Sequence, residues 1–162
     1  MSLMLPSPPP SDARLTDVLP SCYASLGVEG MPNALGLPPA RAVVLVLVDG
    51  LGLMNLAESL GHAPFLRGHF QRVVRMSTVF PSTTASALAS LATGELPGTH
   101  GVLGYRIMNP DTGNIINQLS GLSDVADLTT WLGVPTLHER ADDAGKTSCI
   151  VGLPRFVTSP LT

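Results

Sequence analysis

Residues 42–51 run Ala-Val-Val-Leu-Val-Leu-Val-Asp-Gly-Leu, an uninterrupted aliphatic stretch that ends at Asp49. A run of this kind, without polar alternation, is typical of a parallel strand that is buried on both faces. We therefore predict a strand over residues 41–48. Ligands gather at the carboxyl ends of parallel strands. Asp49 is accordingly the first candidate site residue.

A second stretch, residues 79–94, opens with Val-Phe-Pro-Ser-Thr-Thr and continues in Ala, Ser and Leu to Gly94. The pattern predicts a helix from about Thr84 to Ala92, because Ser and Thr are preferred at helix starts and Gly at helix ends. One hydroxyl of the cluster is expected to cap this helix. The same position faces free backbone N–H groups and suits a phosphate.

The remaining pattern predicts an α/β fold with a mostly parallel sheet flanked by helices. Helical signals cover residues 53–60 and 135–143, with shorter ones in 14–28; strand signals cover 72–78, 102–108, 115–119 and 146–152, with a hairpin-type turn at 109–113. We expect residues 1–40 to form an N-terminal arm and wrapping segment, and residues 41–162 to belong to one domain.

The charge, cysteine content and apolar runs of the chain argue against several kinds of partner and location. The net charge is −3 and no run of Lys or Arg occurs, which argues against a nucleic-acid polymer or an anionic membrane surface as partner. Cys22 and Cys149 lie far apart and form no disulfide framework, and no signal-peptide pattern is visible. A cytoplasmic location is therefore expected. The apolar run at 42–48 is too short to span a bilayer.

The residues alone leave two interpretations of Asp49 and Thr84 open. Asp-Gly is common turn chemistry, and Thr is a common helix cap. Alternatively, a carboxylate and a hydroxyl that grip one divalent cation form an activated nucleophile, because the metal lowers the pKa of the bound oxygen.

Three motifs carry a resemblance: Val-Leu-Val-Asp49-Gly-Leu, then Val79-Phe-Pro-Ser-Thr-Thr84, then Ala92-Thr-Gly-Glu-Leu-Pro-Gly-Thr-His100-Gly101. Together they resemble the type I phosphodiesterase/nucleotide pyrophosphatase family of the alkaline phosphatase superfamily. The resemblance implies an alkaline-phosphatase-like core and a site for two divalent metal ions, usually zinc. It also implies that Asp49 and Thr84 bind one metal, and that Thr84 attacks a small phosphate-ester substrate to form a phosphothreonine.

The chain departs from the family pattern in two ways. Tyr105 occupies the position where nucleotide-hydrolysing relatives carry a phosphate-binding Asn, so its phenol is the expected substrate contact. The family's later Asp-x-x-x-His, Asp-His and further His ligands do not occur in the sequence. We therefore expect an incomplete N-terminal portion of a longer enzyme, with weak metal binding, poor turnover and an apolar surface that promotes self-association. His100 is expected to be structural.

Two alternatives stay open. One is a phosphomutase or phosphonate hydrolase of the same superfamily. The other is a non-catalytic α/β interaction module, in which Asp49 and Thr84 only cap local structure.

Overall fold

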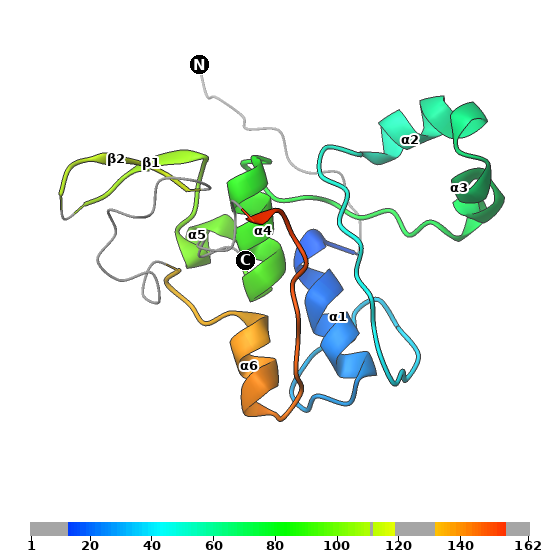
Figure 1. The fold of residues 1–162 in the computed structure, drawn as a ribbon, viewed down its shortest axis with the longest axis horizontal. Coiled ribbons are helices and arrows are strands. Elements are labelled where there is room, and N and C mark those ends of the chain that lie inside the picture. Colours follow the sequence, from blue (N-terminus) through cyan, green and yellow to red (C-terminus); the bar gives the residue numbers. More distant parts are fainter. Residues whose placement is uncertain (1–12, 111, 119–131, 155–162) are drawn as a thin grey trace, which may run out of the picture.

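The computed structural model describes residues 13–110, 112–118 and 132–154. Within these ranges the fold is a small α/β arrangement of helices with one two-stranded sheet (Figure 1). The elements in chain order are η1 (Leu15–Asp17), α1 (Val18–Ser25), α2 (Leu53–Ser59), η2 (Leu60–His62), α3 (Pro64–His69), η3 (Phe70–Arg72), α4 (Thr84–Thr93), α5 (Pro97–His100), β1 (Arg106–Met108), β2 (Ile115–Asn117) and α6 (Leu137–Asp143). No helix in these ranges is both long and apolar enough to cross a lipid bilayer.

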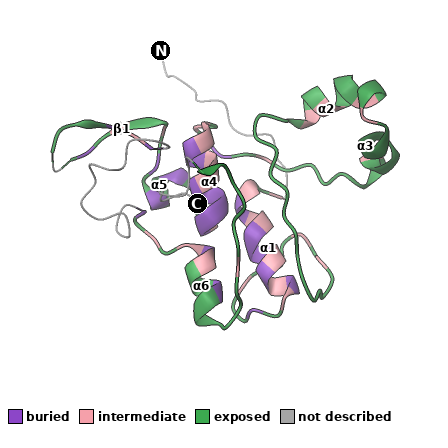
Figure 2. Cartoon of the chain, in the orientation of Figure 1, coloured by how far each residue is buried: buried purple, intermediate pink, exposed green. Residues whose placement is uncertain are grey.

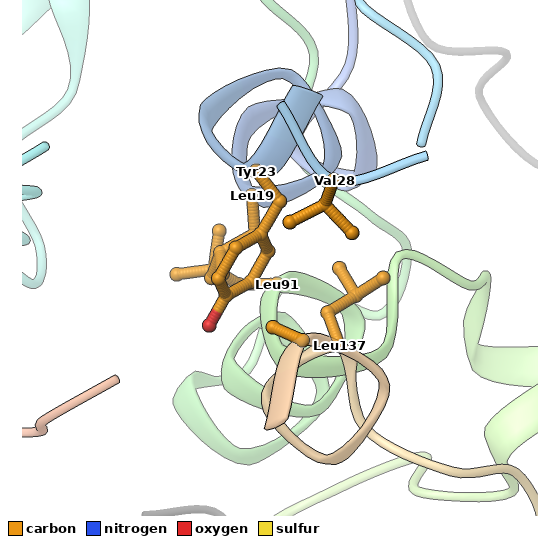
Figure 3. Close-up of a cluster of buried hydrophobic side chains, with 6 residues drawn as sticks. Leu19, Tyr23, Val28, Leu91 and Leu137 are labelled. Carbon is orange, nitrogen blue, oxygen red and sulfur yellow. The ribbon is translucent and has the colours of Figure 1, made fainter. Parts of the chain in front are cut away.

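The main core lies where α1, α4 and α6 meet (Figure 3). Apolar residues four apart lie on one helix face, and this spacing brings Leu19 and Tyr23 of α1 to the same side. Leu137 and Ala141 of α6 share a face for the same reason. The buried cluster consists of Leu19, Tyr23, Val28, Leu91, Leu137 and Ala141.

Helix α4 is central because it contributes to two cores. Leu91 belongs to the main core, whereas Ala85 and Ala89 are fully buried in a second cluster with Val102 and Leu132. Figure 2 shows α4 as the most buried helix in the view. The alanines have no long side chains, so neighbouring segments approach the helix axis closely.

Both ends of α4 are set by local chemistry. Thr83 is the N-cap, with an extended backbone, and its Oγ1 accepts a hydrogen bond from the Ser86 N–H at 3.4 Å. This confirms the predicted hydroxyl cap. Gly94 ends the helix in the left-handed region, at φ 74°, which a residue without a Cβ adopts without strain.

The predicted hairpin is confirmed. Strands β1 and β2 pair antiparallel, with Ile107 opposite Ile116 at the centre of the register. The connecting turn is closed by the Gly113 N–H, which donates to the Asn109 carbonyl at 2.8 Å. Asn and Gly are ordinary turn residues, so the local sequence is sufficient to specify this feature.

The strand predicted for residues 41–48 is not formed, and the described residues do not show the predicted parallel sheet. Residues 41–48 are exposed along their whole length, and Val44 is 88% exposed. Of the region 72–78, only Ser77 makes a bridge, a single parallel one to Arg14, and residues 146–152 carry no strand. A Val/Leu run favours pairing but cannot supply the neighbouring strands and covering layers on which strand stability depends.

Residues 50–76 form an excursion from the rest of the chain, which we call the α2–α3 arm. Its helices α2, η2, α3 and η3 have no buried residue. Among the described elements they contact only one another, and Figure 1 shows them set apart from α1, α4 and α6.

Candidate functional site

Asp49 and Thr84 are in direct contact. The Thr84 Oγ1 hydroxyl donates to Asp49 Oδ2 at 3.1 Å, although the two residues lie 35 positions apart. Asp49 is exposed and Thr84 is partly buried. The expectation that these side chains are neighbours is confirmed, while the expected buried strand in front of Asp49 is absent.

The two adjacent threonine hydroxyls at the start of α4 make different hydrogen bonds. Thr83 caps the helix through its own Oγ1, so the Thr84 hydroxyl is left for Asp49. Thr84 is the first residue of the helix, where backbone N–H groups lack partners within the helix and the dipole is positive. A hydroxyl so placed lies beside N–H groups that can receive a phosphate.

The turn after Asp49 is specified by glycine. Gly50 has φ 74°, in the left-handed region, which costs a residue with a Cβ about 1–2 kcal/mol. The Leu51 N–H closes the turn by donating to the Val48 carbonyl at 3.4 Å. The chain therefore turns away directly after Asp49, and its carboxylate stays at the tip of the turn.

The donor set suits a hard cation. A carboxylate and a hydroxyl supply oxygen ligands, which Mg²⁺ accepts together with several waters, whereas catalytic zinc usually has three protein ligands. Among the described residues, no three His, Cys, Asp or Glu side chains gather in a way that could hold a metal ion. Asp49 and Thr84 therefore fit one hydrated divalent cation, and the described residues do not complete a two-zinc centre.

Tyr105 is not joined to this pair. It lies just before β1 and is 44% exposed. Its carbonyl accepts a hydrogen bond from the Gln118 N–H at 2.9 Å, which holds the backbone beside the end of β2. Within the part of the chain that the structure describes, no hydrogen bond links its phenol to Asp49 or Thr84.

His100 lies at the end of α5, where it is buried and hydrogen-bonded to α4. It is 1% exposed, and its Nδ1 accepts a hydrogen bond from the Val102 N–H at 3.1 Å. The ring proton therefore sits on Nε2, which donates to Ser90 Oγ at 2.8 Å. Burial lowers the pKa of His100, so the ring is neutral at pH 7. This neutral, paired ring fits the structural role expected of it.

A second histidine, His138, is partly buried and connects three segments, a cluster that the sequence does not predict. His138 Nδ1 lies 2.7 Å from the Tyr23 hydroxyl and 3.2 Å from Ser148 Oγ. The cluster ties α6 to α1 and to residues 146–152. Burial lowers the pKa of His138, although Asp142 and Glu139 oppose that shift. Only the helical spacing of α6 hinted that this position faces the core.

Comparison with known proteins gives one finding. A model of the family described as type I phosphodiesterase / nucleotide pyrophosphatase matches residues 43–159, more than half of the chain and a range that includes Asp49, Thr84 and Tyr105. No curated protein and no solved structure matches the chain.

Proposed function

The chain belongs to the type I phosphodiesterase/nucleotide pyrophosphatase family, and from that premise we propose that it is a phosphodiester or pyrophosphate hydrolase with Thr84 as its nucleophile. The observation that carries the proposal is the 3.1 Å contact between Thr84 Oγ1 and Asp49 Oδ2. It holds a hydroxyl at a helix N-terminus with a carboxylate that can accept its proton.

The reaction follows from these groups. Asp49 accepts the Thr84 proton while Oγ1 forms a bond to phosphorus and the ester oxygen leaves, which yields a phosphothreonine. Water then attacks phosphorus and the bond from phosphorus to Oγ1 breaks. Asp49 returns its proton to Oγ1, and the second proton of the water neutralises the alcoholate released in the first step. The first N–H groups of α4 stabilise the charge on the phosphoryl oxygens. The exposed Tyr105 phenol is proposed as a further donor to the substrate.

We propose that Asp49 and Thr84 also hold one divalent cation of the pair, zinc by family resemblance. A cation bound there would lower the pKa of the Thr84 hydroxyl. Two protein oxygens fall short of the three ligands that catalytic zinc usually has. The 162-residue chain is therefore expected to bind zinc weakly and to turn over slowly.

The same contact supports a proposal about the sheet. Residues 41–48 lead into Asp49 and residues 72–78 lead toward Thr84, so the contact joins positions that follow the carboxyl ends of both segments. Parallel strands require that arrangement. In the cation-loaded protein we propose that these segments and residues 146–152 form the parallel sheet of an alkaline-phosphatase-like core.

A reducing, cytoplasmic setting is proposed as well. Cys22 and Cys149 are both free thiols, and burial raises the pKa of Cys22, which makes that thiol less reactive. Free thiols of this kind suit a compartment that keeps cysteines reduced.

The function is tested with bis(p-nitrophenyl) phosphate and Zn²⁺, using wild type, Thr84→Ala and Thr84→Ser. We expect slow zinc-dependent release of nitrophenol that falls at least a hundredfold in Thr84→Ala and is partly kept in Thr84→Ser. Acid quenching followed by peptide mass spectrometry should find phosphate on Thr84.

Ser82→Ala is the matched control, because Ser82 is an exposed hydroxyl in the same cluster. It should leave the rate within twofold of wild type. A Thr84→Ala protein that keeps its rate would rule out the nucleophile. No turnover at all, with the same zinc affinity in Asp49→Asn as in wild type, would favour the non-catalytic module instead.

A further inference from the structure

Residues 41–49, which we call the Val/Leu segment, have no strand partner among the described residues, although the Asp49 side chain at their end accepts a hydrogen bond from Thr84. Within the described ranges, no backbone hydrogen bond involves residues 42–47. The side chains alternate in exposure. Val44, Val46 and Val48 are 88%, 75% and 57% exposed, whereas Val43, Leu45 and Leu47 are 36%, 44% and 51% exposed. The odd-numbered side chains are thus less exposed than the even-numbered ones, although every residue of the segment is exposed (Figure 2).

The composition of this segment favours pairing with another strand. Seven aliphatic residues follow one another without a charge, proline or glycine. Charges and prolines are the devices by which natural proteins protect exposed edges. Segments of six or seven residues with high β propensity and low net charge are the ones that pair between molecules.

The charges at the two ends select a register. The segment begins at Arg41 and ends at Asp49, with Leu45 at its centre. If two copies pair antiparallel about Leu45, the Arg41 of each copy lies opposite Asp49 of the partner subunit. In a parallel pair each charge would lie opposite its own kind, which is unfavourable.

The same register keeps the two faces of the segment apart. Val44 lies opposite the partner's Val46, and Val43 opposite the partner's Leu47, so the more exposed side chains meet one another. A shift by one residue would mix the faces. We propose that a second copy of this chain docks on residues 41–49 by antiparallel strand pairing centred on Leu45, which gives a closed two-fold dimer.

The proposed dimer engages Asp49 from a new side, because the partner's Arg41 competes with Thr84 for its carboxylate. A divalent cation on Asp49 and Thr84 should then weaken the dimer. This one expectation rests on the proposed function, whereas the dimer itself does not.

The dimer is tested by sedimentation velocity and light scattering on the full chain without added metal. With rising concentration the wild-type mass should move from 16.9 kDa toward twice that value and stop there. Arg41→Asp and Asp49→Arg should each weaken the dimer at least tenfold, because opposite charges become like charges. An equimolar mixture of the two variants should restore it, since each acidic end then meets a basic one.

Arg72→Asp is the matched control, because it makes the same charge change at an exposed arginine outside the segment. It should dimerise as wild type does. In a Cys149→Ser background, oxidation should crosslink Leu45→Cys, whose equivalent lies directly opposite, faster than Val44→Cys. Circular dichroism checks that each variant keeps its helices.

Several outcomes would overturn the proposal. A monomer at the highest concentration reached would mean that the segment is covered within its own chain, as in the parallel sheet. Growth beyond a dimer that ignores the charge changes would mean general aggregation. A dimer that survives both single substitutions would place the interface elsewhere. If zinc fails to shift the dimer while the charge exchange behaves as expected, only the proposed metal role of Asp49 is contradicted.

Discussion

The histidine side chains of α5 and α6 show how burial affects protonation. His100 donates to Ser90 and accepts from Val102, so both ring nitrogens are used in the neutral form. A second proton would have to enter where the Val102 N–H already points. His138 is partly buried, with Tyr23 and Ser148 at its Nδ1. Both histidines therefore resist protonation in the folded protein.

The stability of the protein should depend on pH for this reason. Burial lowers the pKa of His100 and His138 below the ordinary 6.5, so the unfolded chain binds protons more readily. Stability is then fully present above pH 6.5 and is lost as the pH falls below it. The urea concentration at the unfolding midpoint, measured from pH 8 to pH 5, should stay constant down to about pH 6.5 and decrease at lower pH.

His100→Gln should flatten this dependence, and what remains should come from His138. Glu139 acts at lower pH, because hydrogen bonds from Thr136 lower its pKa below 4.5. Its contribution is lost only as the pH falls below that value. Midpoints that stay flat between pH 7 and pH 5 in wild type would contradict the role given to the buried rings.

Secondary-structure elements meet at Gly94, the end of α4. A Cβ built there would lie 3.3 Å from both Leu137 Cδ1 and Pro20 Cγ, and the backbone has φ +74°. Gly94→Ala should therefore destabilise the fold by about 1–2 kcal/mol from the left-handed backbone alone, with a further cost from crowding α1 and α6. Urea unfolding measures the difference.

Gly98→Ala is the control for that substitution. Gly98 lies in α5, has no positive φ, and would place its Cβ in open space. It should change stability by less than about 0.5 kcal/mol. Equal losses in the two variants would show that the junction at Gly94 is not tightly packed.

The elements that could be predicted from sequence are those whose signals are local. The α4 helix and the 109–113 turn follow from Thr, Gly and Asn at fixed positions. The helix expected from Pro135 begins at Leu137 instead, because Thr136 is its cap and accepts from the Glu139 N–H. The strand predicted for residues 41–48 is not formed. A strand depends on neighbouring strands from other parts of the chain, which its own sequence does not supply.

The candidate site likewise has contacts that the sequence predicts and contacts that it does not. The contact of Asp49 with Thr84 was expected, because each residue follows a recognisable motif. The cluster of Tyr23, His138 and Ser148 was not expected, since it depends on how three distant segments pack. Sequence spacing alone does not encode that packing.

Among the described residues, much surface is exposed. The Val/Leu segment is exposed along its whole length, and the helices of the α2–α3 arm bury no residue. Folding therefore buries less area than the length of the chain suggests.

The urea dependence of unfolding should report this directly. The slope of unfolding free energy against urea scales with the area exposed on unfolding. We expect a slope well below that of compact domains of similar length, and an increase in slope when the Val/Leu segment is covered. A slope typical of a compact domain of 162 residues at low protein concentration would contradict the open arrangement.

The α2–α3 arm leaves the rest of the chain directly after Asp49, whose side chain contacts Thr84, and rejoins it at Ser77, which forms a bridge to Arg14. Closing a longer flexible loop across the same two points costs only about 0.6 kcal/mol for each doubling of its length. Because the helices of the arm bury no residue, sequence there can be added, removed or exchanged with little effect on the packing of α1, α4 and α6. The arm is therefore the natural place for this architecture to diversify, and for an engineer to graft a foreign module directly beside the candidate nucleophile.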